Sequence, residues 1–331
     1  MSDRKKIAVI GAGIAGLTFA RSLHGIADIT IFEKSHGVGG RMATRRAGEI
    51  TFDHGAQYFT VRDPLFHAML EPALELGFVE TWSGTIGSSS MGSASIIDES
   101  DRAPRFVGVP SMTALPKWMA HGLDIRLGVT IDAIEGSPCN WRLATGYERA
   151  GPFDWVVAAC PAPQAMALMP ANYSGFRAAA STKMNACFTL MLILQSRALG
   201  RHCAVRYDDE VIAWVADCTS RPQRSPLPTI VVHSQNQWAD RHVDDDLEVV
   251  RTAMLDSLAR LLPGVPEGVL SANVHRWKFA NVQTVSESDV LMDLENGLAA
   301  CGDWTIGNRV EAAFLSATRL SKAIGERLWQ T

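Results

Sequence analysis

A glycine-rich hexapeptide near the N-terminus has the spacing of a dinucleotide-binding turn. It reads Gly11-Ala12-Gly13-Ile14-Ala15-Gly16 and lies between an apolar strand-like segment and a helix-like segment. In such a turn the first glycine permits a sharp bend, the second lets the backbone approach a pyrophosphate, and the third lets the helix close on the strand. Free amides at the helix N-terminus then donate to phosphate oxygens. The hexapeptide therefore predicts binding of an adenine dinucleotide.

An acidic residue stands where a ribose-binding carboxylate is expected. Glu33, followed by Lys34, ends the next apolar segment, and a carboxylate about 20 residues after the first glycine accepts hydrogen bonds from ribose hydroxyls. The alternative is a glycine-rich turn with an exposed glutamate. The coincidence of strand, turn, helix and carboxylate favours the nucleotide site.

Two further segments decide between NAD and FAD. Gly39-Gly40-Arg41-Met42 follows the second apolar segment, and Cys301-Gly302-Asp303-Trp304 follows the last one, close to the C-terminus. Arg41 is suited to neutralise a pyrophosphate, and Asp303 to accept from ribityl hydroxyls. A ligand that touches both ends of the chain favours FAD. The alternatives are a solvated loop arginine and a helix N-cap.

Three short segments have side chains suited to a planar substrate ring. The segment Gln57-Tyr58-Phe59-Thr60 combines aromatic faces with an amide and hydroxyls, Phe106-Val107-Gly108 adds a ring and a glycine, and His275-Arg276-Trp277 adds a cation and an indole wall. Hydride transfer to a flavin needs such a shielded, positioning pocket. The alternatives are that Tyr58 and Phe59 belong to the core and that His275 is a structural histidine.

The elements that position these residues begin with a βαβ unit. Strands are predicted over Lys6–Ile10 and Ile29–Phe32, with a helix over Ile14–Leu23 between them. Further strands are predicted over Leu123–Leu127, Thr130–Ile134, Asn140–Thr145, Trp155–Ala159, Cys187–Leu194, Ile212–Val215, Ile230–His233 and Leu298–Cys301. Helices are predicted over Pro64–Leu76, Asp244–Leu262 and Val310–Trp329, a loop over 83–104 and a proline-rich linker over 221–228.

Composition sets the class of protein. The chain has 331 residues, 47% of them hydrophobic, and a formal net charge of −4; this length predicts two lobes, and this charge argues against nucleic acid as the main partner. The six cysteines form no C-x-x-C pair, so we expect neither zinc nor a dithiol redox motif. We predict no metal site. Glycines interrupt the apolar N-terminal stretch, and no segment reaches the ~20 apolar residues of a membrane span. We expect a cytoplasmic enzyme.

The motifs together resemble the FAD-dependent amine oxidase superfamily. This similarity rests on Ile10–Gly16, Glu33-Lys34, Gly39–Met42, Cys301–Trp304 and Val310–Ala313, while Phe52–Thr60, Phe106–Met112, Pro161–Gln164 and His275–Trp277 resemble its bacterial renalase branch. One departure is Glu311-Ala312-Ala313, where the family has Glu-Gly-Ala. An added methyl there could tilt the flavin or narrow its seat.

The resemblance implies an α/β fold with two domains. A discontinuous Rossmann-like FAD-binding domain would comprise residues 1–78, 123–165 and 278–331, and a mixed-sheet α+β substrate domain residues 79–122 and 166–277. It implies non-covalent FAD, with Val129, Ile131, Gly302 and Val310 among its contacts, and a substrate site that adds Val61, Lys183 and Ile306. Many relatives place a lysine near the flavin through a water; whether Lys183 or Lys278 does so stays open, and Lys278 has the alternative of a surface lysine.

Three functions follow from this resemblance. The first is an oxidase that converts 1,2- or 1,6-dihydro isomers of NAD(P)H to NAD(P)⁺ and passes the electrons to O2. The second is an amine oxidase or a desaturase of an amine or isoprenoid, and the third is a non-catalytic FAD-binding protein. A second glycine hexapeptide is absent from the sequence, so a pyridine nucleotide would enter as substrate. The sequence leaves the oligomeric state open.

Overall fold

The first of two large sheets contains the N-terminal βαβ unit. The computed structural model describes residues 4–90, 95–99 and 103–328. The sheet has the order β19-β20-β13-β1-β2-β9 and is parallel except for β19 at its edge. Its strands are β1 (Lys6–Ile10), β2 (Asp28–Glu33), β9 (Asp124–Leu127), β13 (Trp155–Ala158), β19 (Leu291–Asp293) and β20 (Leu298–Ala300). The two central strands β1 and β13 are apolar and almost wholly buried, as parallel strands covered on both faces must be.

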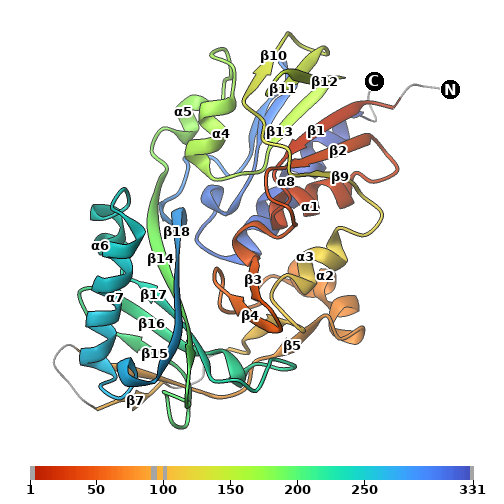
Figure 1. Cartoon of the computed structure of the whole chain (residues 1–331). Helices are drawn as coiled ribbons and strands as arrows, with labels where there is room; N and C mark the ends of the chain where they lie inside the picture. Colours follow the sequence, from red (N-terminus) through yellow and green to blue (C-terminus); the bar gives the residue numbers. More distant parts are fainter. Residues whose placement is uncertain (1–3, 91–94, 100–102, 329–331) are drawn as a thin grey trace.

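Two helices from opposite ends of the chain pack together on this sheet. The helices are α1 (Ile14–Ser22) and α8 (Val310–Leu328), and Figure 1 shows them side by side under β1 and β2. Leu17 and Phe19 of α1 and Leu320 and Ile324 of α8 lie in one apolar core. The predicted βαβ unit and the C-terminal helix are confirmed, although Trp329 lies outside the described residues.

The second sheet is mixed and forms the other half of the molecule. Its order is β18-β14-β17-β16-β15-β6-β7, and its strands are β6 (Thr85–Ser89), β7 (Ile97–Asp98), β14 (Lys183–Leu194), β15 (His202–Tyr207), β16 (Ile212–Asp217), β17 (Thr229–Ser234) and β18 (Val269–Thr284). The long strands β14 and β18 run from this half toward the first (Figure 1). The mixed two-part α/β architecture that the sequence predicts is confirmed.

The helices α6 (Asn236–Arg241) and α7 (Leu247–Leu261) cover one face of this second sheet. Val250, Met254 and Leu258 of α7 pack in a core with Phe188 and Leu190 of β14, and α6 adds to the same layer. Because side chains alternate along a strand, the residues between these apolar ones face the opposite side. That opposite face looks toward the first sheet and supplies one wall of the site.

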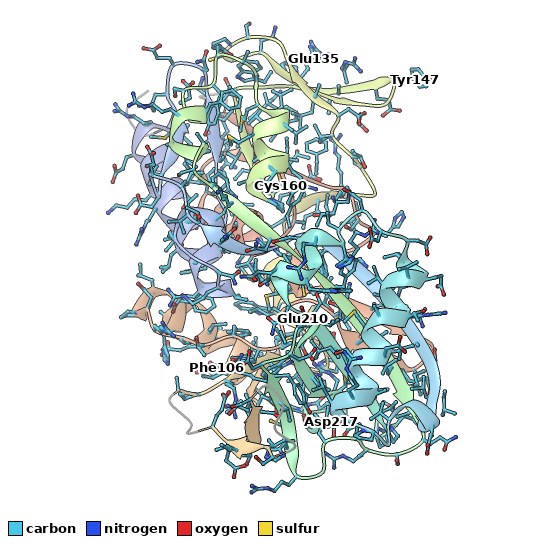
Figure 2. All side chains as sticks on the ribbon, turned by 90° about the vertical axis from the view of Figure 1, so that its left-hand side faces the viewer. Phe106, Glu135, Tyr147, Cys160, Glu210 and Asp217 are labelled. Atoms are coloured by element: carbon cyan, nitrogen blue, oxygen red, sulfur yellow. The ribbon has the colours of Figure 1, made fainter. Side chains whose placement is uncertain are left out.

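Smaller elements complete the chain. They are the hairpins β3 (Thr44–Ala47) with β4 (Ile50–Asp53) and β5 (Val79–Thr81) with β8 (Phe106–Gly108), the sheet β10 (Ala133–Glu135), β11 (Trp141–Thr145) and β12 (Glu148–Phe153), and the helices α2 (Pro64–Glu75), α3 (Ala114–Met119), α4 (Ala162–Leu168) and α5 (Phe176–Ala179). Tyr147 lies at the turn between β11 and β12, at the tip of the molecule in Figure 2.

Several predicted boundaries differ from those of the structure. The predicted loop 83–104 contains β6 and β7, because β6 pairs with β15 far along the chain; residues 91–94 and 100–102 of that loop lie outside the described part. The predicted strand Thr130–Ile134 begins only at Ala133, and the helix predicted from Asp244 begins at Leu247 with Asp246 as its cap. Long-range pairing and a local cap, rather than residue preference, set these limits.

Candidate functional site

A cavity of about 1110 Å³ lies between the two sheets. The ends of β1, β2 and β13 open into it from one side, and β14 to β18 wall it from the other. Cys160, labelled near the middle of Figure 2, lies just after β13 and lines it. The structure brings these predicted site residues to its wall: Gly11, Gly13, Ile14, Ala15, Glu33, Lys34, Gly40, Arg41, Gln57, Tyr58, Val129, Ile131, His275, Arg276, Trp277, Gly302, Asp303 and Val310.

The glycine turn has the geometry that its spacing predicts. Gly11 has a φ of +110°, and a Cβ there would lie 2.7 Å from the Ala159 carbonyl oxygen. A Cβ on Gly16 would lie 2.0 Å from the Gly11 carbonyl oxygen, so the helix closes directly on the turn. Gly13 caps α1 without a side-chain hydrogen bond, and a Cβ there would meet open space. The first amides of α1 therefore face the cavity, as a pyrophosphate requires.

Glu33 is a buried brace of this turn. Its side chain accepts from the Ala12 amide and from the Ser35 amide, both at 2.8 Å. Ala12 itself does not line the cavity; it acts through this bond. The alternative of an exposed glutamate is wrong, since the residue is buried and still borders the cavity.

Arg41 and Asp303 form one unit on the cavity wall. Arg41 donates to both carboxylate oxygens of Asp303, at 2.8 and 2.5 Å, and to the Ala280 carbonyl at 2.9 Å. Asp303 is 4% exposed, so the bidentate pair is the means by which its charge is tolerated. The alternative of a solvated loop arginine is wrong. The pair joins the two ends of the chain, as the two motifs suggested.

The departure from the family pattern at the start of α8 lies away from the cavity. Ala312 is fully buried and does not line the cavity, whereas Val310 and Ala313 do. Glu311 turns back to accept from the amides of Arg62 and Asp63, at 2.6 and 2.8 Å. Neither the extra methyl nor this carboxylate therefore faces a ligand in the cavity.

Three histidines and a tryptophan gather where the second sheet meets the loop after β4. The ring of His54 lies 4.8 Å from that of His275 and 5.0 Å from that of Trp277, between ring centroids. Burial, reinforced by His275 and Arg45, lowers the pKa of His54 to about 4, and burial with Arg221 and His54 does the same for His233. These two imidazoles are neutral at pH 7.

A buried hydrogen-bond chain fixes one of these imidazoles. Arg221 donates to the side-chain oxygen of Gln57 at 2.7 Å, which turns the amide nitrogen toward His233 Nε2, 3.3 Å away. The same nitrogen donates to the carbonyls of Asp53 and Gly55. The amide has two N–H groups for these three acceptors and presents only donors to Nε2 of His233.

Other predicted site residues lie elsewhere. The rings of Phe59 and Phe106 stack with centroids 6.0 Å apart in the core, so the core alternative holds for Phe59. A Cβ on Gly108 would meet the Ser111 carbonyl at 2.5 Å, so its close approach is to its own chain. The residues that do not line the cavity are Gly16, Phe59, Thr60, Val61, Phe106, Val107, Gly108, Lys183 and Ile306. Their predicted roles stay predictions, without direct access to the cavity.

The two lysines differ in position. Lys183 is exposed and does not line the cavity, whereas Lys278 borders the cavity and pairs with Asp244 at 2.9 Å. More than half of the Lys278 side chain is exposed, at 54%. The geometry fits the surface-lysine alternative for Lys278, at the rim of the cavity.

Many residues of the cavity wall escaped the sequence analysis. They include His54, Thr189, Arg206, Trp214 and His233. Four of these five lie on β14 to β17, where they alternate with apolar residues of the opposite face. Strands β14, β16 and β17 are apolar and mostly buried on both faces, so no period-two pattern marked these positions.

Two family models and a curated relative match this chain. A model of the NAD(P)-binding Rossmann-like domain matches residues 9–72, and a model of the flavin containing amine oxidoreductase family matches residues 74–325. The chain belongs to this family. It is similar to renalase of Mus musculus, with 23% identity over 96% of the chain and 98% of the relative.

Solved structures of the same fold include two oxidases. Cyclohexylamine oxidase of Brevibacterium oxydans matches with a TM-score of 0.74, 14% identity and coverage of 98% of this chain and 99% of the other. Putrescine oxidase bound to putrescine matches with a TM-score of 0.70, 13% identity and coverage of 97% and 98%. The chain is a renalase-like, flavin-dependent oxidoreductase of this family.

Its described residues include no group suited to hold a metal, and no helix among them is long and apolar enough to cross a membrane.

Proposed function

We propose that the protein is an oxidase that binds FAD without a covalent bond and oxidises 1,2- or 1,6-dihydro isomers of NAD(P)H. In the overall reaction the isomer, O2 and one proton give NAD(P)⁺ and H2O2. The isomer loses a hydride, which carries two electrons, and O2 gains these two electrons and two protons. Similarity to renalase over nearly the whole chain supports this substrate class.

The charge of the cavity wall favours a nucleotide substrate over an amine substrate. Among the described residues, the carboxylates of its wall are Glu33 and Asp303, and backbone amides or Arg41 already hold both. The residues that line the cavity include six cations: Lys34, Arg41, Arg206, Arg276, Lys278 and Arg309. Four of them pair with a carboxylate, of which only Asp303 lines the cavity, so cations outnumber carboxylates on the wall itself. Such a cavity attracts the phosphates of a nucleotide and disfavours an ammonium group.

The residues that would hold FAD are those at the ends of β1, β2 and β20. Amides of the glycine turn and of the start of α1 suit the pyrophosphate, Glu33 suits the ribose, and the Arg41–Asp303 pair suits the neighbouring hydroxyls and phosphates. Bound FAD supplies a ring that accepts a hydride and returns two electrons to O2. We propose the discontinuous division of the chain into residues 1–78, 123–165 and 278–331 and residues 79–122 and 166–277 on the same basis.

Thiol chemistry supports a non-covalent cofactor. Burial raises the pKa of the Cys301 thiol, and this residue does not line the cavity. Cys160 does line the cavity, but burial raises its pKa to about 12. Both thiols stay protonated at pH 7, and a thiol is a poor nucleophile toward a flavin ring.

The neutral histidines supply hydrogen-bonding groups that carry no charge. His54 and His233 add hydrogen-bonding groups without adding charge, so they do not repel the cationic nicotinamide ring of the product. Trp277 lies against His54 and adds a flat apolar wall. This end of the cavity suits a planar ring that carries a carboxamide.

Aerobic turnover tests the proposal. Purified protein is mixed with the 1,2- and 1,6-dihydro isomers, with ordinary 1,4-dihydro NAD(P)H and with mono- and polyamines, and peroxide is measured against substrate consumed. We expect one peroxide per isomer and none from amines. Peroxide from amines alone would establish the amine oxidase alternative, and no turnover of any compound by flavin-replete protein would overturn the proposal.

A further inference from the structure

One row of side chains crosses the second sheet at a single level. The register pairs His275 of β18 with Thr189 of β14, Thr189 with His233 of β17, His233 with Trp214 of β16, and Trp214 with Arg206 of β15. Directly paired residues of neighbouring strands point to the same face. All five line the cavity, so we call them the cavity row.

The cavity row is long and differs at its two ends. Four steps between strands at about 4.8 Å each give a span of about 19 Å. One end is the cluster of His54, His275 and Trp277, and the other is the guanidinium of Arg206. A small amine covers only a fraction of this span, whereas an extended nucleotide covers much more of it.

Arg206 is held in place by aromatic neighbours. Its guanidinium carbon lies 4.8 Å from the centroid of the Trp214 ring, and it donates to the Tyr58 hydroxyl oxygen at 2.7 Å. Glu99 is an ion-pair partner, 3.1 Å from Nε of Arg206. A guanidinium stacked on an indole keeps its remaining N–H groups in the ring plane, where they can donate to two phosphate oxygens.

One polar atom of the row, Nε1 of Trp214, is buried without a hydrogen-bond partner among the described residues. Buried polar groups are ordinarily satisfied, so this indole N–H is an unmet donor of the cavity wall. It lies on the strand next to Arg206, toward the end of the row away from His275.

We propose that the cavity row is the wall along which the substrate nucleotide lies, with its nicotinamide ring at the histidine end and a substrate phosphate on Arg206. This inference rests on the proposed function and adds the residue that selects a nucleotide over a bare dihydronicotinamide. Arg206 is separate from Arg41, which pairs with Asp303 beside the glycine turn. The two arginines thus serve different phosphates.

Binding of oxidised ligands tests this inference without turnover. FAD-loaded wild type and Arg206→Met are titrated with NAD⁺, nicotinamide mononucleotide and nicotinamide riboside, and the flavin absorbance change is recorded. We expect Arg206→Met to weaken the two phosphate-bearing ligands about tenfold or more, since one charge-assisted hydrogen bond is lost. The riboside should change less than twofold, and Arg206→Lys should recover part of the loss.

Two further variants sharpen the result. Arg201 is an exposed arginine just before β15, the strand of Arg206; it pairs with Asp98 and does not line the cavity, so Arg201→Met is the matched control and should leave all three affinities unchanged. Glu99→Gln removes the competing carboxylate and should tighten the phosphate-bearing ligands.

Three results would overturn the inference. They are an equal loss for the riboside, no loss for NAD⁺, and a wild type that binds none of the three ligands. Failure of the proposed function is seen separately, as absent peroxide from the dihydro isomers in wild type.

Discussion

Replacing His54 by phenylalanine should make the protein less sensitive to acid. The ring of His54 is 7% exposed and packs on His275 and Trp277, and phenylalanine retains a ring there that does not titrate. Burial, with His275 and Arg45, lowers the pKa of His54 from 6.5 to about 4. Between pH 6.5 and pH 4 His54 is protonated in the unfolded chain and neutral in the folded protein, so acid favours unfolding.

The size of this effect follows from the shift. Above pH 6.5 the imidazole is neutral in both states and costs nothing, and below that value the cost grows by about 1.4 kcal/mol per pH unit until pH 4. At pH 5 it amounts to about 2 kcal/mol, an upper bound where the cavity admits water. Between pH 7.5 and 5, wild type should therefore lose about 2 kcal/mol more stability than His54→Phe.

Urea unfolding at a series of pH values measures this difference. Both proteins are unfolded with the same excess of FAD, and tryptophan fluorescence gives the free energy of unfolding at each pH. His121→Gln, which replaces an exposed histidine, is the control and should follow the wild-type pH dependence. Parallel curves for wild type and His54→Phe would refute the claim that this histidine is held neutral by burial.

Three further changes test the cofactor site. Asp303→Asn should weaken FAD binding and lower stability by about 1.5–3 kcal/mol each, since one charge-assisted bond to Arg41 is lost; equilibrium FAD titration and urea unfolding check this, and unchanged values would contradict it. Glu33→Ala should weaken FAD by about 1.5–3 kcal/mol, with Glu33→Gln intermediate; equal affinities by titration would show that Glu33 only braces the turn. Acid precipitation of yellow holoenzyme should leave all flavin in the supernatant, and flavin in the pellet would indicate a bond to a thiol such as Cys160.

The sequence predicted the part of the site that local geometry determines. Gly11, Gly13 and Gly16 lie within six residues, in the turn after β1 and the start of α1. Their spacing in the sequence therefore determines their arrangement in space. Glu33 ends the neighbouring strand β2 and comes to the same edge because parallel strands end together. These residues needed no long-range information.

The rest depends on contacts between distant segments. Strand β18 has no period-two pattern because most of its residues are half-buried on both faces, so its 16 residues were not recognised. Residues on four other strands enter the cavity row only through the order of the second sheet, and a single sequence does not specify that order. The Arg41–Asp303 pair joins positions 262 residues apart, and only the folded chain shows that the two side chains satisfy each other.

Anaerobic rapid mixing tests the central claim most directly. Flavin absorbance is followed after the oxidised enzyme meets one equivalent of the 1,2- or 1,6-dihydro isomer, of 1,4-dihydro NAD(P)H, or of putrescine as a representative diamine. The electropositive cavity predicts rapid bleaching by an isomer, with one NAD(P)⁺ formed per flavin reduced, and no rapid bleaching by the amine. Rapid bleaching by the amine with none by either isomer would contradict the account.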